Sequence, residues 1–284
     1  TGKYVYCTDD ETVNTVGSES KAGKMSPRNM LTTTIGDELR LATNMQSKVI
    51  GISQKDRASI LPAGHTANAA YWYDGSNGAF ITSTFYMQQL PIWVTTFNDK
   101  KLPEKYLSQD WTTLLPLASY TESLADDNAF EGLFKGESKP VFPHKLAELK
   151  EKNKGLNMIR ATPFGNSLTK DFALEAIKNE QLGTDEITDF LSVSFSSTDY
   201  VGHQYGINAI ETEDTYLRLD KDLEELINYL EKNIGKNNFV IFLTADHGGA
   251  HNAAYLQSVK VPSGFIDEKA IETAMKAHLK EVFG

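Results

Sequence analysis

Two apolar runs, each followed by an aspartate and a histidine, constrain the fold of this 284-residue chain more than any other feature. Residues 239–243 read as a buried strand bounded by turn residues, and Asp246-His247 follows shortly after it. Residues 190–195 form the second run, and Asp199-Tyr200-Val201-Gly202-His203 comes after it. Open α/β sheets bind ligands at the carboxyl ends of their strands. We therefore expect both Asp/His pairs to lie at one edge of a sheet.

Further periodic segments complete an α/β pattern. Residues 48–53 read as another strand that ends in a charged loop, and residues 71–84 predict a hairpin around a glycine-rich turn. Capping residues and apolar spacing predict helices over residues 26–42, 169–179, 208–235 and 267–282. The alternation of strands and helices predicts an α/β fold with a mostly parallel sheet sandwiched by helices.

Residues 86–158 show no long periodic pattern. Proline, asparagine, aspartate and aromatic residues are scattered through them, and a structureless run of this length is unusual inside a compact domain. We therefore expect a cap-like insertion with short elements and its own small aromatic core. Residues 1–85 and 159–284 would then form the α/β core.

Composition excludes several classes of partner. The formal charge of −10 and the pI near 5.1 leave no basic stripe for a nucleic acid. No apolar run is long enough to span a membrane. The single cysteine, Cys7, excludes an internal disulfide and any multi-cysteine zinc site.

The two Asp/His pairs carry suitable metal ligands. Asp199 and His203 are four positions apart, so on a helix they share one face. Asp246 and His247 are adjacent, and the following Gly248-Gly249 would allow the backbone to bend so that both reach one centre. Aspartate and neutral histidine bind zinc, and four ligands from two strand ends suit two metal ions. Either pair alone is weak evidence, but their joint occurrence favours a metal centre.

Three motifs also resemble a known family. Thr198-Asp199-Tyr200-Val201-Gly202-His203 and Thr244-Ala245-Asp246-His247-Gly248 are similar to the two metal motifs of the alkaline phosphatase superfamily. Ser53-Gln54-Lys55-Asp56-Arg57 resembles the monoesterases of the flavobacterial alkaline phosphatase type, on the phosphodiesterase/nucleotide pyrophosphatase branch. The resemblance runs along the whole chain. It implies two zinc ions, one held by Asp199 and His203 and the other by Asp246 and His247.

The resemblance further implies that Lys55 and Arg57 contact the phosphoryl oxygens of a small phosphate monoester. Two cations suit a monoester because its dianion carries an extra charged oxygen, and an arginine fork can bind two oxygens at once. Without the resemblance, a solvated charged loop accounts better for these two residues. The implied reaction is metal-dependent hydrolysis through a phospho-threonine intermediate.

Several groups of the family have no counterpart in this sequence. They are the threonine nucleophile, the aspartate ligand before it, an asparagine that contacts the phosphoryl group, and a late histidine ligand. We therefore expect this chain to be the middle part of a periplasmic or secreted, monomeric alkaline phosphatase, and to be inactive alone. A phosphodiesterase of the same superfamily and an inactive core fragment with weak or no metal binding remain the alternatives.

Overall fold

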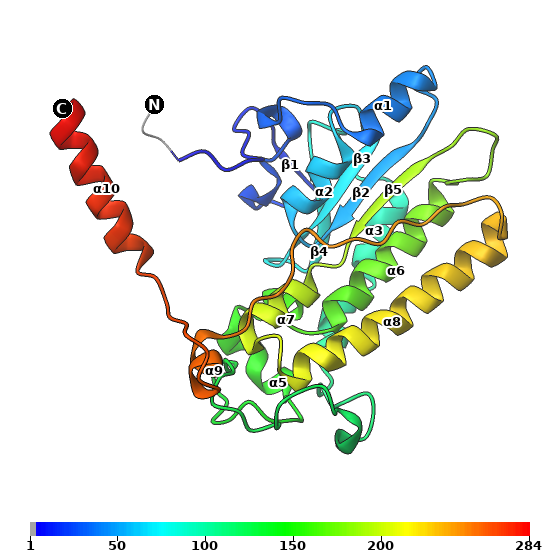
Figure 1. Ribbon diagram of the computed structural model, residues 1–284. Helices are drawn as coiled ribbons and strands as arrows, with labels where there is room; N and C mark the ends of the chain where they lie inside the picture. Colours follow the sequence, from blue (N-terminus) through cyan, green and yellow to red (C-terminus); the bar gives the residue numbers. More distant parts are fainter. Residues whose placement is uncertain (1–3) are drawn as a thin grey trace.

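A five-stranded sheet with helices on both faces forms the body of the protein in the computed structural model, which describes residues 4–284 (Figure 1). The strands, in chain order, are β1 (Thr15–Val16), β2 (Val49–Ser53), β3 (Ala69–Asp74), β4 (Ala79–Ser83) and β5 (Phe190–Ser194). They lie in the order β1-β4-β3-β2-β5. β2 pairs in parallel with β3 and β5, whereas β4 pairs antiparallel with β3 and β1. The α/β class is confirmed, and the sheet is mixed because the β3–β4 hairpin reverses the chain without a crossover.

Helices accompany the sheet along the chain, and some of them contact its strands. The α-helices are α1 (Ile35–Ala42), α2 (Asp56–Ala63), α3 (Ile92–Asp99), α4 (Leu102–Tyr106), α5 (Leu146–Leu149), α6 (Phe164–Asn179), α7 (Ser197–Tyr205), α8 (Ile210–Leu230), α9 (Ala253–Ser258) and α10 (Glu268–Phe283). Short 3₁₀ turns are η1 (Lys21–Gly23), η2 (Pro27–Asn29), η3 (Leu117–Ser119), η4 (Lys150–Asn153) and η5 (Gly155–Ala161), and α8 continues into one π-helical turn, η6 (Glu231–Gly235). Figure 1 shows α10 apart from the sheet, and its apolar side chains are exposed.

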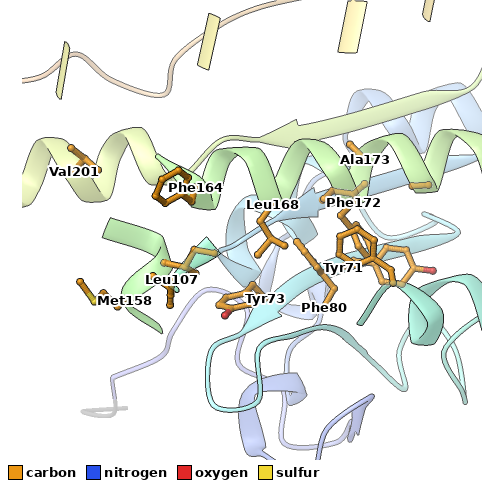
Figure 2. Close-up of a cluster of buried hydrophobic side chains, with 14 of the residues drawn as sticks. Tyr71, Tyr73, Phe80, Leu107, Met158, Phe164, Leu168, Phe172, Ala173 and Val201 are labelled. Atoms are coloured by element: carbon orange, nitrogen blue, oxygen red, sulfur yellow. The ribbon is translucent and has the colours of Figure 1, made fainter. Parts of the chain in front are cut away.

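Side chains alternate between the two faces of the sheet, as the pleat requires. Tyr71, Tyr73 and Phe80 belong to the larger apolar cluster, which also contains Phe172 of α6 (Figure 2). The rings of Phe80 and Phe172 stack with their centroids 4.0 Å apart. This face carries the main hydrophobic core, because α6 and α3 cover it.

The opposite face packs against α2. Trp72 and Ile81 belong to a second apolar cluster, which also contains Ile60 of the helix. The helix passes so close to β2 that a Cβ added to Gly51 would lie 2.1 Å from the carbonyl oxygen of Ser59. Only glycine permits this approach, which holds α2 and the residues before it at the end of β2.

The prediction that residues 86–158 have a separate core is wrong. Trp111 and Phe134 belong to the same apolar cluster as the central strands, and the ring centroids of both lie about 6 Å from that of Tyr205 in α7. Rings of the segment also contact one another, as Trp111 and Phe142 do, so its apolar packing is continuous with that of the core helices. Whether the segment is an insertion stays a prediction.

Two other expectations need correction. Residues 26–42 form not one helix but η2 and α1, because Thr34 and Asp37 make a capping box that begins α1 anew. Residues 239–243 form no strand: Val240, Phe242 and Leu243 are largely exposed, and the segment between α8 and α9 is coil (Figure 1). An apolar run becomes a strand only when a neighbouring strand pairs with it, and this run pairs with none of the described residues.

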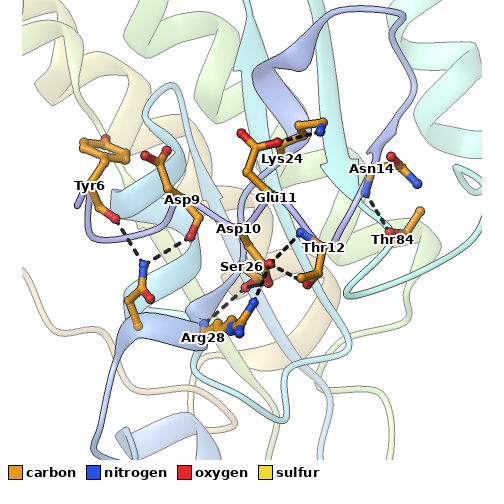
Figure 3. A network of polar contacts seen from close by, with 11 residues as sticks. Tyr6, Asp9, Asp10, Glu11, Thr12, Asn14, Lys24, Ser26, Arg28 and Thr84 are labelled. Atoms are coloured by element: carbon orange, nitrogen blue, oxygen red, sulfur yellow. Dashed lines mark hydrogen bonds and ion pairs between the residues drawn. The ribbon is translucent and has the colours of Figure 1, made fainter. Parts of the chain in front are cut away.

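A buried aspartate, Asp10, holds the N-terminal segment together (Figure 3). Asp10 accepts hydrogen bonds from Ser26 Oγ at 2.6 Å and from the backbone N–H of Thr12 at 2.9 Å, and Arg28 lies 3.4 Å away. Burial by itself would raise the pKa of Asp10, but these hydrogen bonds outweigh it and lower the pKa to about 2. The carboxylate is therefore ionised at neutral pH and organises the loop around it.

A buried histidine joins residues 86–158 to α8. His144 is fully buried, with Nδ1 2.7 Å from Glu137 Oε1 and Nε2 3.1 Å from Glu211 Oε1. Burial alone would lower the His144 pKa, but the two carboxylates outweigh it and raise the pKa to about 9. Burial raises the pKa of nearby Glu131 to about 8. Both groups thus bind protons more tightly in the folded protein.

We predict that unfolding free energy falls as the pH rises from about 6 to about 10. The contribution of His144, on the order of 3 kcal/mol, is complete below its ordinary pKa and is lost as the pH approaches its folded pKa. His144→Gln should flatten this part of the profile, and the exposed-helix substitution His278→Gln should not. Urea unfolding across the range measures both, and an unchanged pH slope in His144→Gln would contradict the assignment.

Candidate functional site

The parallel pair β2–β5 brings two distant parts of the sequence to one edge of the sheet. Ser53 lies opposite Ser194 at the carboxyl ends of the strands, and the chain leaves each strand directly into a helix. Lys55 precedes the first residue of α2, and Asp199 lies in the first turn of α7. Lys55 Nζ and Asp199 Oδ2 are 2.5 Å apart, an ion pair between residues 144 positions apart in sequence.

Both candidate Asp/His pairs meet at Asp199. His203, one turn along α7, has its Nε2 3.3 Å from Asp199 Oδ1. His247 comes from the coil between α8 and α9, and its Nε2 lies 3.7 Å from the same oxygen and 3.6 Å from Asp246 Oδ2. Lys55, His203 and His247 therefore surround the Asp199 carboxylate, and Asp246 joins this polar cluster through His247.

This cluster is protected on one side and open on the other. The side chains of Lys55 and Asp199 are 17% and 26% exposed, whereas His203, His247 and Asp246 are 75%, 60% and 90% exposed. Burial alone would raise the pKa of Asp199, but Lys55, together with His203 and His247, holds that pKa below its ordinary value. Asp199 is therefore an ionised, partly desolvated carboxylate that small solutes can approach.

Arg57 has a different environment from Lys55. Its side chain is exposed, and its Nη1 lies 3.1 Å from Tyr6 Oη. Tyr6 donates in turn to Asp56 at 2.9 Å. The structure thus joins Lys55 to the Asp/His pairs and links Arg57 to the N-terminal segment.

Tyr200 follows Asp199 directly, and its sequence context predicts no role for it. Lys55 Nζ lies 4.7 Å from the centroid of its ring, a cation–π contact that helps to orient the ammonium group. The tyrosine stands beside Asp199 in the motif, but adjacency in sequence does not reveal whether a helical side chain faces a neighbouring loop. Only the packing of α7 against the end of β2 brings the two groups together.

The donor set matches the chemistry of zinc, which binds carboxylate oxygens and imidazole nitrogens. Across residues 4–284, however, no group of three or more His, Cys, Asp or Glu side chains is arranged to hold a metal ion. A surface cavity of about 310 Å³ lies elsewhere, near Gly78, Asn98 and Glu104, and none of the candidate site residues lines it. No helix within the described part of the chain has the length and apolar character to cross a membrane.

Comparison with known proteins identifies the class. Residues 1–281 match the family described as type I phosphodiesterase / nucleotide pyrophosphatase, and the chain belongs to that family. It is 57% identical to the alkaline phosphatase PhoV of Synechococcus elongatus, over 93% of this chain and 47% of that protein. It is 53% identical to the alkaline phosphatase PafA of Elizabethkingia meningoseptica, over 100% of this chain and 52% of that protein. A Myroides odoratus protein named calcium-transporting ATPase is 55% identical, over 100% of this chain and 52% of that protein.

Solved structures agree with the sequence comparison. The crystal structure of wild-type PafA superimposes with a TM-score of 0.92 at 52% identity, covering 99% of this chain and 53% of that one. A PafA mutant with a threonine, an asparagine, a lysine and an arginine replaced matches with a TM-score of 0.91 at 51% identity, over 96% of this chain and 53% of that one. The chain thus spans about half the length of the relatives it matches.

The Lys55–Asp199 pair should stabilise the fold measurably. Removing one partner leaves a partly desolvated charge, so a double-mutant cycle with Lys55→Met and Asp199→Asn should give a coupling energy of about 1 kcal/mol or more. Lys221→Met and Glu224→Gln provide the matched cycle, because that pair is exposed and its coupling should be about 0.5 kcal/mol or less. Urea unfolding measures both cycles, and equal couplings would contradict the prediction.

Proposed function

We propose that this chain carries part of the active site of a zinc-dependent phosphate monoesterase, an alkaline phosphatase of the type I phosphodiesterase / nucleotide pyrophosphatase family. The observation that carries the proposal is the cluster at Asp199, where Lys55, His203 and His247 come within 3.7 Å of one carboxylate. The alkaline phosphatase names of two close relatives support it. Such enzymes act on small phosphate esters. We also propose that this one is periplasmic or secreted.

In this proposal Asp199 and His203 hold one zinc ion, and Asp246 and His247 hold the other. Metal ions held there would supply positive charge to the attacking and leaving oxygens of an in-line displacement. Asp199 suits its part because its carboxylate is ionised at neutral pH and partly exposed, so no proton must leave before a cation binds. The exposure of His203, His247 and Asp246 leaves their donor atoms accessible.

Lys55 and Arg57 would supply positive charge to the phosphoryl oxygens. The PafA mutant described above has a lysine and an arginine replaced two positions apart, which is the spacing of Lys55 and Arg57. The Tyr200 ring and the Asp199 carboxylate hold the ammonium group of Lys55 in place before a substrate arrives. Preorganised charge of this kind stabilises a dianionic phosphoryl group without further reorganisation.

Lys55→Ala should lower kcat/KM for a phosphate monoester by roughly 100-fold and for a diester by much less, because the diester lacks the extra charged oxygen. The measurement requires an active protein that contains this chain. Lys48→Ala is the matched control, since Lys48 lies at the start of β2 and its ammonium group contacts the carbonyl oxygen of Glu180. Equal losses for both substrates would favour a phosphodiesterase, the second function that the family description supports.

We further propose that the 284 residues lack the nucleophile and some metal ligands, so that the phospho-threonine reaction needs groups from outside them. The isolated chain should then lose most of its zinc on dialysis against metal-free buffer, because two ligands per ion are fewer than zinc sites normally have. It should also release no phosphate from p-nitrophenyl phosphate. Elemental analysis and the colorimetric assay test both points, and retention of two zinc ions with turnover would overturn this part of the proposal.

The remaining alternative is an inactive fold that binds no metal specifically. Zinc titration calorimetry separates it from the proposed site: Asp199→Asn should weaken zinc binding by roughly 10-fold or more if Asp199 is a ligand. The exposed Asp220→Asn on α8 serves as the control. Equal zinc affinity in all three proteins would favour the inactive fold.

A further inference from the structure

A group of buried polar side chains connects the segments that carry Lys55 and Asp199 with α6. Gln54, Asn166 and Ser197 are at most 1% exposed. Gln54 follows β2 and precedes Lys55, Ser197 begins α7, and Asn166 lies in the first turn of α6. We call these three residues the polar layer.

Hydrogen bonds in the polar layer connect all three chain segments. Gln54 Nε2 donates to Ser197 Oγ at 3.3 Å, and the backbone N–H of Ser197 donates to Asn166 Oδ1 at 3.1 Å. A second link runs beside it, since Ser53 Oγ and Ser196 Oγ are 2.9 Å apart. Two side-chain hydrogen bonds therefore connect the segment that leads to Lys55 with the segment that leads to Asp199.

The backbone of α6 closes tightly on this layer. A Cβ added to Gly165 would lie 2.1 Å from Ser197 Oγ and 2.3 Å from Gln54 Nε2. No side chain other than that of glycine fits there without moving α6, α7 or the end of β2. The layer is thus a fixed contact between three elements.

Stability alone does not account for this choice of residues. Gln54 Oε1 and Asn166 Nδ2 are buried without a hydrogen-bond partner among the described residues. Each such atom costs roughly 1–3 kcal/mol, so a packed apolar side chain of similar volume at position 54 would be at least as stable. Buried polar groups that lower the stability of the fold indicate another role, here the positioning of neighbouring groups.

We propose that the polar layer is a positioning device, which sets the separation of Lys55 Nζ and the Asp199 carboxylate. Gln54, Ser197 and Asn166 act through the backbone segments that carry these two groups. The functional part of this inference rests on the proposed role of Lys55 and Asp199 in phosphoryl and zinc binding. The geometric part concerns only the ion pair and is independent of that role.

Gln54→Met is the decisive variant, because it keeps the side-chain volume and removes both the hydrogen bond to Ser197 and the unpartnered oxygen. Its unfolding free energy should be equal to or higher than that of the wild type. The Lys55–Asp199 coupling, measured by the double-mutant cycle in this background, should nevertheless fall by about half or more. Zinc affinity of the chain should weaken by roughly 10-fold.

Ser197→Ala and Thr215→Val provide the comparison. Both remove one buried hydroxyl, but Thr215 lies in α8 and donates to the carbonyl oxygen of Glu211. Ser197→Ala should reduce the coupling like Gln54→Met, and Thr215→Val should leave it unchanged. An undiminished coupling in both Gln54→Met and Ser197→Ala overturns the positioning role. If the Lys55–Asp199 coupling falls in these variants but the chain binds no zinc, the positioning role is supported and the proposed function is contradicted.

Discussion

The parallel pairing of β2 with β5 is the constraint on which the candidate site depends. Ser53 is the register partner of Ser194, so both strands end at the same position, at the same edge of the sheet. Lys55 and Asp199 can then form a 2.5 Å ion pair although 144 positions separate them. A slip of one residue in this register would turn every side chain of β5 to the other face and separate the two groups.

The central elements could be predicted because their signals are local. β2, β5 and the β3–β4 hairpin follow from apolar runs bounded by turn residues, and the spacing of Asp199 and His203 places both on one face of α7. Residues 239–243 carry the same apolar signal as β5, yet they remain coil. A free strand edge is available, because β5 lies at the end of the sheet, so an apolar run alone does not decide whether a segment pairs.

Other parts of the site could not be predicted because they depend on contacts between distant segments. Nothing in the sequence distinguishes Gln54, Asn166 and Ser197 from ordinary polar residues at helix starts and strand ends. Their role emerges only when Gly165 lets α6 approach so closely that the three side chains meet. The same holds for Tyr200, which contacts Lys55 only because α7 packs against the end of β2.

Two buried polar groupings join parts of the chain that apolar packing alone would hold less specifically. His144 links Glu137 to Glu211, and the polar layer links β2, α6 and α7. Apolar side chains can slide past one another at small cost, whereas a buried hydrogen bond is lost outright when its partners shift. Sites built from charged groups a few ångströms apart need this kind of support, because Coulomb energy between partly buried charges changes steeply with distance. The polar layer connects the two segments that carry Lys55 and Asp199, so a displacement within it alters the distance between their charges.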